Sequence, residues 1–150
     1  KYNLTDIAAA LGLAQLKKCE RFWKKREQYA ALYHEGFRDL AEIMCPQVAS
    51  HVQHAWHLYV IQLELDRLRV TRDEFIRQLQ EAGVGCSVHF IPLHLHPYHR
   101  DTWGYLADDF PVASMAFQRI VSLPLYSRMT EDDVKRVIDT VRCLVEKNRR

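Results

Sequence analysis

The pattern of apolar and polar positions predicts a long helix at the start of the chain. Thr5 has a side chain typical of a helix N-cap, and helix-forming residues continue over 6–40. Over 6–16 the apolar residues cover every side of the helix, which is typical of a helix buried all round. From position 19 onward they narrow to a single stripe, formed by Cys19, Phe22, Tyr33, Phe37 and Leu40. One continuous helix is predicted, unless Gly12 or Gly36 breaks it.

After Pro46 the pattern changes to an alternation of strands and helices. Residues 56–63 are rich in β-branched and aromatic side chains, which predicts a strand. Thr71-Arg72-Asp73-Glu74 has the spacing of a capping box and predicts a helix that ends at Gly83. Residues 84–90 are expected to form a second strand.

The last third of the chain repeats this alternation. A polar, aromatic and histidine-rich stretch covers 91–110, and Pro111 suits the first turn of a short helix. Residues 120–123 predict a third strand, and Thr130 caps a final helix. The core face of that helix is expected to be Val134, Val137, Ile138, Val141 and Val145. The predicted fold is α/β (α+β): a long N-terminal helix, then β-α-β-α-β-α, with a small sheet packed by helices in one domain over 1–150.

Composition places the chain among ordinary globular domains. Its 150 residues are 48% hydrophobic and 27% charged, with a net charge of +2. This charge supplies no general attraction to nucleic acid or to a membrane surface. No apolar run approaches the ~20 residues of a membrane span, and no targeting segment is recognisable. The chain opens without Met and close to a helix start, so we expect it to be part of a longer protein.

The four cysteines are Cys19, Cys45, Cys86 and Cys143, and no two of them form a C-x-x-C pair. This spacing fits neither a disulfide framework nor a zinc site. We expect reduced and mostly buried thiols, in a protein of the cytoplasm.

Two groups of polar residues could carry binding chemistry. Six cations lie within ten positions of the first helix: Lys17, Lys18, Arg21, Lys24, Lys25 and Arg26. Five of them fall on one arc away from the apolar stripe, so a solvated helix face explains them better than a nucleic-acid site. Histidines form a second group at His89, His94, His96 and His99. With Tyr98, Trp103 and Tyr105 these supply hydrogen-bond donors and stacking surfaces in a loop after a strand end, where ligand sites tend to lie.

No complete catalytic or metal site is predicted. The sequence lacks a nucleophile elbow, a phosphate-binding glycine loop and a zinc-protease motif. No acid or thiol ligand stands among the histidines of the second group before Asp101, so no metal site is assigned. The seven lysines lie at the terminus or on charged helix faces, where none is expected to be buried.

Several blocks of sequence resemble one enzyme family. Residues 1–16 (Lys-Tyr-Asn-Leu-Thr-Asp-Ile-Ala-Ala-Ala-Leu-Gly-Leu-Ala-Gln-Leu) resemble the K-Y-N-x-T-D-I-x-A-A-(I/L)-x-L-x-Q-L signature of the DegT–DnrJ–StrS sugar-nucleotide aminotransferases. Further blocks follow in the family's order at 54–59, 71–75, 88–98 and 122–130. These enzymes use pyridoxal phosphate and have the aspartate-aminotransferase fold (fold type I), which implies that this chain is their C-terminal small domain.

The resemblance also implies roles for individual residues. Asn3 would reach the cofactor phosphate of the neighbouring subunit in a homodimer. His89, His94 and Tyr98 would border the pocket for the sugar nucleotide. The implied reaction transfers an amino group, usually from glutamate, to a keto-sugar nucleotide for envelope polysaccharide or related amino-sugar biosynthesis. The lysine that holds the cofactor would lie in a preceding large domain, so no catalytic residue is expected in this chain, and the chain alone is expected to be inactive.

Two other classes are compatible with the residues alone. One is a stand-alone interaction or regulatory module built on this domain. The other is a histidine-rich module that binds metal or nucleic acid. A lysine-bearing domain encoded upstream of residue 1 would favour the aminotransferase, whereas a start codon there would favour a stand-alone module.

Overall fold

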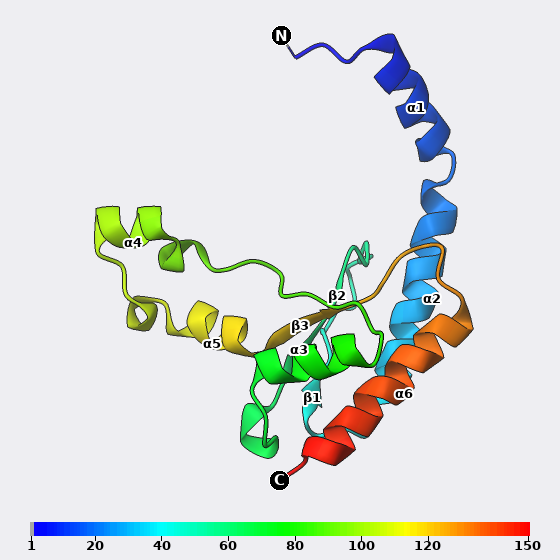
Figure 1. Cartoon of the computed structure of the whole chain (residues 1–150). Coiled ribbons are helices and arrows are strands. Elements are labelled where there is room, and N and C mark those ends of the chain that lie inside the picture. The colour runs from blue at the N-terminus through cyan, green and yellow to red at the C-terminus, as the bar shows by residue number, and fades with distance from the viewer. Residues whose placement is uncertain (1) are drawn as a thin grey trace.

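The computed structural model describes residues 2–150 and places helices around a small sheet (Figure 1). The first half of the chain contains α1 (Asp6–Leu16), α2 (Cys19–Phe37), β1 (Ile43–Met44), β2 (Tyr59–Leu63) and α3 (Arg72–Glu81). The second half contains α4 (Pro97–Trp103), α5 (Pro111–Arg119), β3 (Ile120–Leu123) and α6 (Glu131–Asn148). Single 3-10 turns cover Leu65–Arg67, Leu93–Leu95 and Ala107–Asp109.

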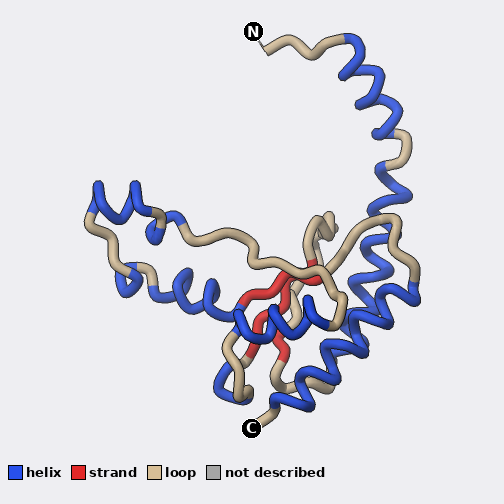
Figure 2. The backbone as a smooth tube through the Cα atoms, viewed as in Figure 1, coloured by secondary structure: helices blue, strands red, loops and turns tan. Residues whose placement is uncertain are grey.

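The sheet is antiparallel, with the strand order β1-β2-β3 (Figure 2). Tyr59 pairs with Leu123 at one end of β2, and Leu63 pairs with Ile43 at the other. Alternate residues of β2 are fully buried, namely Tyr59, Ile61 and Leu63, as expected for a strand with one face on the core. The class predicted from sequence, a small sheet packed by helices, is confirmed.

The core lies where α2, α3 and α6 meet the sheet. Helix α2 packs against α6, and α3 packs against both α6 and β3. Most of the largest fully buried side chains come from these elements: Tyr29, Tyr33, Phe37, Tyr59, Ile61, Leu63, Phe75 and Leu79. Leu68, between β2 and α3, is also fully buried. The predicted core face of the last helix is confirmed, since Val134, Val141 and Val145 are fully buried, Val137 is buried and Ile138 packs against the cluster.

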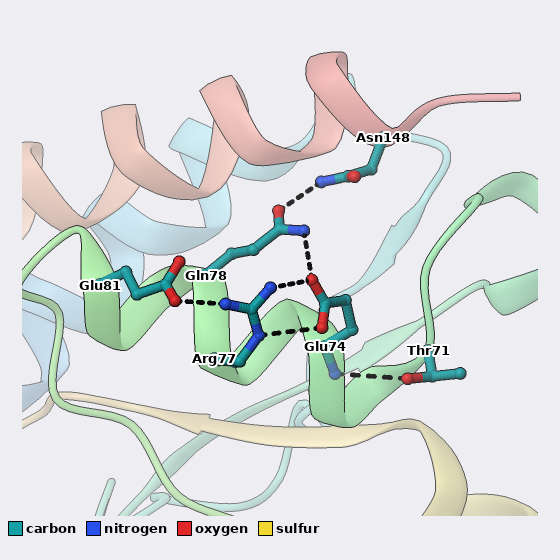
Figure 3. A network of polar contacts seen from close by, with 6 residues as sticks. All are labelled: Thr71, Glu74, Arg77, Gln78, Glu81 and Asn148. Carbon is teal, nitrogen blue, oxygen red and sulfur yellow. Dashed lines mark hydrogen bonds and ion pairs between the residues drawn. The ribbon is translucent and has the colours of Figure 1, made fainter.

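Three predicted helix starts are confirmed, two by a threonine cap and one by a proline in the first turn. The Thr71 hydroxyl accepts a hydrogen bond from the Glu74 N–H at 3.3 Å (Figure 3). The Glu74 carboxylate pairs with Arg77 and Gln78, so the reciprocal half of the predicted capping box is replaced by a network within α3. Thr130 forms a complete capping box at α6, and Pro111 opens α5 as predicted.

The single long helix expected over 6–40 is wrong. The α-helical hydrogen bonding is interrupted at Lys17–Lys18, where the Lys18 N–H donates to the carbonyl of Gln15, three residues back, at 2.8 Å and closes a tight turn. Neither glycine causes the break. It falls where the all-round apolar pattern gives way to the stripe, because only α2 has a core to pack against.

Two strand predictions also need correction. Trp56 adopts a left-handed backbone with φ 48°, so β2 begins at Tyr59 instead of 56. Residues 84–90 do not form a strand, and only Ser87 bridges to Ser122 on the edge of β3 away from β2. The sheet's third member is instead β1, a two-residue strand too short to give a sequence pattern.

Gly36 allows α2 and α6 to approach closely. A β-carbon at this position would lie 2.7 Å from Cγ2 of Ile138, whereas one at Gly12 would meet nothing within 4 Å. Gly36→Ala is expected to lower the free energy of unfolding by about 1 kcal/mol, because overpacking outweighs the gain in helix propensity. Gly12→Ala, the matched control, should not destabilise the fold. Urea unfolding measures both, and a stabilised Gly36→Ala variant would show that Ile138 repacks freely.

Glu42 binds the C-terminal end of the chain through Arg149. Its carboxylate accepts hydrogen bonds from Nε and Nη2 of Arg149 at 2.7 and 3.2 Å, although Glu42 is only 5% exposed. Burial acts to raise the pKa of this carboxyl, but the hydrogen bonds from Arg149 and the backbone outweigh it and hold the pKa below its ordinary value.

The pH dependence of this contact follows from the sign of that shift. A carboxyl whose folded pKa lies below its unfolded value of about 4.3 stabilises the fold above that pH, and the contribution is lost as the pH falls through the folded pKa. Glu42→Gln should therefore cost about 1–2 kcal/mol at pH 7 and progressively less below about pH 4.3. Asp132→Asn, whose side chain is 94% exposed, is the control and should change the free energy of unfolding at pH 7 by less than about 1 kcal/mol. If the loss of stability in Glu42→Gln does not change with pH, the ion-pair explanation is contradicted.

Candidate functional site

Two segments project from the body around the sheet (Figure 1). One is α1 with the extended residues before it, and the other is an arm, defined as residues 88–119, that carries α4 and α5. The predicted site residues lie on these two segments: Asn3 precedes α1, whereas His89, His94 and Tyr98 belong to the arm.

Asn3 lies in the extended segment just before the helix cap. Its side chain is exposed, and the Thr5 hydroxyl that follows accepts from the Ala8 N–H at 3.2 Å and starts α1. No residue of α1 is buried in the part of the chain that the structure describes. The segment therefore presents the Asn3 amide to whatever lies outside this domain.

His94 is the most firmly held of the predicted residues. It is 6% exposed, its Nε2 lies 2.9 Å from Oγ of Ser114, and its ring stacks on Phe110 with 4.7 Å between centroids. The Ser114 hydroxyl in turn donates to the carbonyl of Ala107 at 2.8 Å. His94 thus joins the start of the arm to α5, a role that its spacing in the sequence did not reveal.

His89 and Tyr98 are more open. The His89 ring is half-buried and lies 4.4 Å from the ring of Phe90, a residue with φ 55°. Tyr98 is 70% exposed at the start of α4, and its ring meets the edge of His99 at 5.3 Å. Both side chains can therefore contact a ligand or another chain.

The arm owes its shape to local signals. Pro97 opens α4 and Gly104 ends it in a left-handed conformation with φ 69°. Several of its large apolar side chains are exposed: Phe90, Ile91, Leu93, Trp103, Leu106 and Val112. A surface with this many exposed apolar groups is typical of a region that other parts of an assembly cover.

The lysines of this chain bear on whether it could hold pyridoxal phosphate by itself. None of the six lysines among residues 2–150 is buried: Lys18 is half-buried, and Lys17, Lys24, Lys25, Lys135 and Lys147 are exposed. A covalently bound cofactor needs a lysine in a desolvated site. None of the described lysines therefore meets this requirement.

The described residues form neither a metal site nor a membrane span. Across 2–150 there is no group of three His, Cys, Asp or Glu side chains placed to hold a metal ion. No helix within the described chain combines the length and hydropathy needed to cross a bilayer.

The prediction of a solvated basic face is confirmed, since Lys17, Arg21, Lys24 and Lys25 are exposed and Lys18 is half-buried. Arg26, the sixth cation, lies off that arc and is half-buried. Nη1 of Arg26 donates to the carbonyl oxygens of Trp56 and His57, both at 2.9 Å, and of Leu125 at 3.1 Å. Trp23, in the same turn, donates from Nε1 to the carbonyl of His54 at 2.9 Å. These contacts hold the segment before β2 against α2.

The expectation of mostly buried cysteines is wrong. Cys19 and Cys143 are exposed, and Cys45 and Cys86 are half-buried. Cys19 starts α2 before the helix reaches the core, and Cys143 points away from the core face of α6. Burial raises the pKa of the Cys45 and Cys86 thiols above the ordinary value, which keeps both protonated at neutral pH.

The fold is that of a domain of fold type I aminotransferases. The sugar aminotransferase Spr1654 from Streptococcus pneumoniae in its PMP-form superimposes with a TM-score of 0.87 at 29% identity, over 97% of this chain and 36% of that chain. The aminotransferase from Psychrobacter cryohalolentis gives a TM-score of 0.88 at 21% identity, over 99% of this chain and 40% of that one, a likeness of fold alone.

Sequence comparison narrows this class to one family. The profile of the DegT/DnrJ/EryC1/StrS aminotransferase family matches residues 1–142, and the chain belongs to this family. MJ1066 of Methanocaldococcus jannaschii is 48% identical over 99% of this chain and 39% of its own length. The spore coat polysaccharide biosynthesis protein SpsC of Bacillus subtilis is 45% identical over 97% of this chain and 38% of its own length. The chain thus spans about two-fifths of the length of the curated relatives that it matches.

Proposed function

We propose that this chain is the C-terminal small domain of a pyridoxal-phosphate-dependent aminotransferase that transfers an amino group from glutamate to a keto-sugar nucleotide. The observation that carries the proposal is the family match over residues 1–142. The product would serve polysaccharide or amino-sugar biosynthesis, in keeping with the name of SpsC. Because the chain spans about two-fifths of such relatives, a large domain with the cofactor-binding lysine would complete the enzyme.

Bound pyridoxal phosphate supplies the electron sink for the chemistry, and the protein supplies binding, orientation and proton transfer. The exposed Asn3 amide would donate a hydrogen bond to the cofactor phosphate of the neighbouring subunit in a homodimer. His89 and Tyr98 would border the pocket for the sugar nucleotide, each with a side chain that can reach a ligand. His94 would fix the arm beneath them through Ser114 and Phe110. The exposed apolar arm and α1 fit a homodimer, and such an enzyme would act in the cytoplasm.

Activity of the complete protein tests this function. The protein that contains this chain should convert a keto-sugar nucleotide to its amino sugar with glutamate as donor. The spectrum of its cofactor should change when glutamate is added to the pyridoxal form, and when the keto-sugar nucleotide is added to the pyridoxamine form. The 150-residue chain by itself should bind no cofactor covalently, because its described lysines are exposed or half-buried. A stoichiometric covalent adduct on one of its lysines would contradict the assignment of the lysine to another domain.

Asn3 gives a residue-level prediction in the complete enzyme. Asn3→Ala should weaken cofactor binding by roughly 2- to 150-fold, the range for one hydrogen bond to a neutral or charged acceptor. Asn3→Asp should weaken it further, because a carboxylate would face the phosphate. Cofactor retention after dialysis measures both, and helix content should not change. Equal affinity in all three proteins would reject the phosphate contact.

A further inference from the structure

The hydroxyl of Ser114, in α5, has two partners but a single proton. Its Oγ lies 2.8 Å from the carbonyl oxygen of Ala107 and 2.9 Å from Nε2 of His94. A carbonyl oxygen only accepts, so the contact with Ala107 is a hydrogen bond only if the Ser114 hydroxyl donates its proton there. Toward His94 the hydroxyl oxygen must then accept, and Nε2 must carry a proton.

These two contacts set the tautomer of His94. A neutral imidazole has one N–H, so a proton on Nε2 leaves Nδ1 as a hydrogen-bond acceptor. The opposite tautomer would place two lone pairs against each other, either at Nε2 or at the Ala107 carbonyl, because Ser114 has only one proton to donate. The stack of the His94 ring on Phe110, with 4.7 Å between centroids, fixes the plane in which the lone pair of Nδ1 lies.

Nδ1 of His94 keeps access to the outside of the domain. It forms no hydrogen bond within residues 2–150. In that part of the chain the side-chain atoms that are both sealed from solvent and unpaired are two nitrogens of Arg72 and Oγ of Ser122, and Nδ1 is not one of them. A ligand can therefore reach this acceptor, although His94 as a whole is only 6% exposed.

We propose that Ser114 is a positioning residue that holds His94 in its Nε2–H form, so that Nδ1 accepts a hydrogen bond from a hydroxyl group of the sugar. The choice of a sugar rests on the proposed function, in which His94 borders the pocket for the sugar nucleotide. The lone pair of Nδ1 repels phosphate oxygens, which are acceptors themselves, so this atom selects the hydroxyl-bearing part of the substrate over its diphosphate.

The tautomer is measurable in the 150-residue chain without substrate. At pH 8, where histidine side chains are ordinarily neutral, long-range ¹H–¹⁵N NMR should show His94 with a protonated Nε2 and an unprotonated Nδ1. Ser114→Ala should move the two nitrogen shifts toward each other as both tautomers become populated, and Ser114→Thr, which keeps the hydroxyl, should restore them. Ser50→Ala, at an exposed serine outside the arm, is the control and should leave them unchanged. A proton on Nδ1 in the unmodified chain, or unchanged shifts in Ser114→Ala, would overturn the proposal.

Kinetics of the complete enzyme test the contact with the sugar. Ser114→Ala should lower kcat/KM for the keto-sugar nucleotide by roughly 2- to 13-fold, the range for one neutral hydrogen bond, and leave kcat/KM for glutamate unchanged. The inhibition constant of the matching nucleoside diphosphate, which lacks the sugar, should not change. An equal loss of affinity for the diphosphate would place the donor in the nucleotide and overturn the proposal. A complete protein without aminotransferase activity would reject the proposed function and with it the sugar contact, whereas the NMR result on Ser114 would stand.

Discussion

Replacing Arg26 with methionine is expected to lower the free energy of unfolding by about 2–4 kcal/mol. One guanidinium nitrogen, Nη1, donates to the carbonyls of Trp56, His57 and Leu125, which come from two separate segments. Methionine keeps an apolar stem of similar reach but leaves these acceptors without a donor, and each such loss costs about 1–3 kcal/mol where water cannot replace it. The carbonyls are only partly buried, so the combined loss should fall short of three full penalties.

The same variant should loosen the chain before β2. Trp56 has φ 48°, a conformation that a bulky side chain adopts only when its surroundings enforce it, and Arg26 holds its carbonyl. Amide exchange at residues 54–58 should therefore rise in Arg26→Met more than elsewhere. Lys24→Met removes a cation whose side chain is 67% exposed and should change stability by less than about 0.5 kcal/mol. Equal effects of the two substitutions would mean that Arg26 acts only as one charge of the basic face.

Predictions from sequence succeeded where local signals and burial agree. The last helix has a capping box at Thr130 and a wide valine stripe, and both its start and its core face were predicted correctly. The short helix carries its own start signal at Pro111, and both this helix and the strand over 120–123 were placed correctly. In each of these elements the tertiary packing reinforces what the residues prefer locally.

The failures have tertiary causes. Residues 84–90 have the composition of a strand, yet only Ser87 reaches β3, because the segment leaves the sheet to enter the arm. The two residues of β1 form a strand only because Leu63 and Gln62 of β2 pair with them. Lysine is a good helix former, so nothing at Lys17–Lys18 marked the end of α1. Such outcomes depend on partners far away in the sequence, which periodicity does not contain.

The candidate site was also predicted only in part: the sequence identified its residues but not their tertiary surroundings. The resemblance of motifs selected Asn3, His89, His94 and Tyr98, and the structure shows three of them on one arm. The motifs did not predict how differently these side chains are surrounded. A histidine in a loop is equally compatible with an exposed ligand contact and with the buried stack that His94 makes on Phe110.

The 150-residue chain is expected to self-associate through α1, and changing two leucines to lysine should make it monomeric. Ile7, Leu11, Leu13 and Leu16 are 78, 62, 63 and 68% exposed, and the structure buries none of the side chains of α1. Full burial of each such side chain is worth about 1.5–3 kcal/mol, so contact between two copies of α1 offers a large stabilisation. In the complete enzyme we expect a neighbouring domain or subunit to cover this helix.

Sedimentation at micromolar concentrations measures this association. The unmodified chain should sediment as a dimer or larger, and Leu11→Lys/Leu13→Lys should sediment as a monomer with its core unfolding transition intact, because neither leucine contacts the core. Gln47→Lys/Gln53→Lys adds the same positive charge at exposed positions outside α1 and should remain associated. A monomeric wild-type chain would show that α1 does not drive association. If the glutamine variant also dissociates, charge repulsion and not loss of apolar contact would explain the effect, because both variants raise the net charge equally.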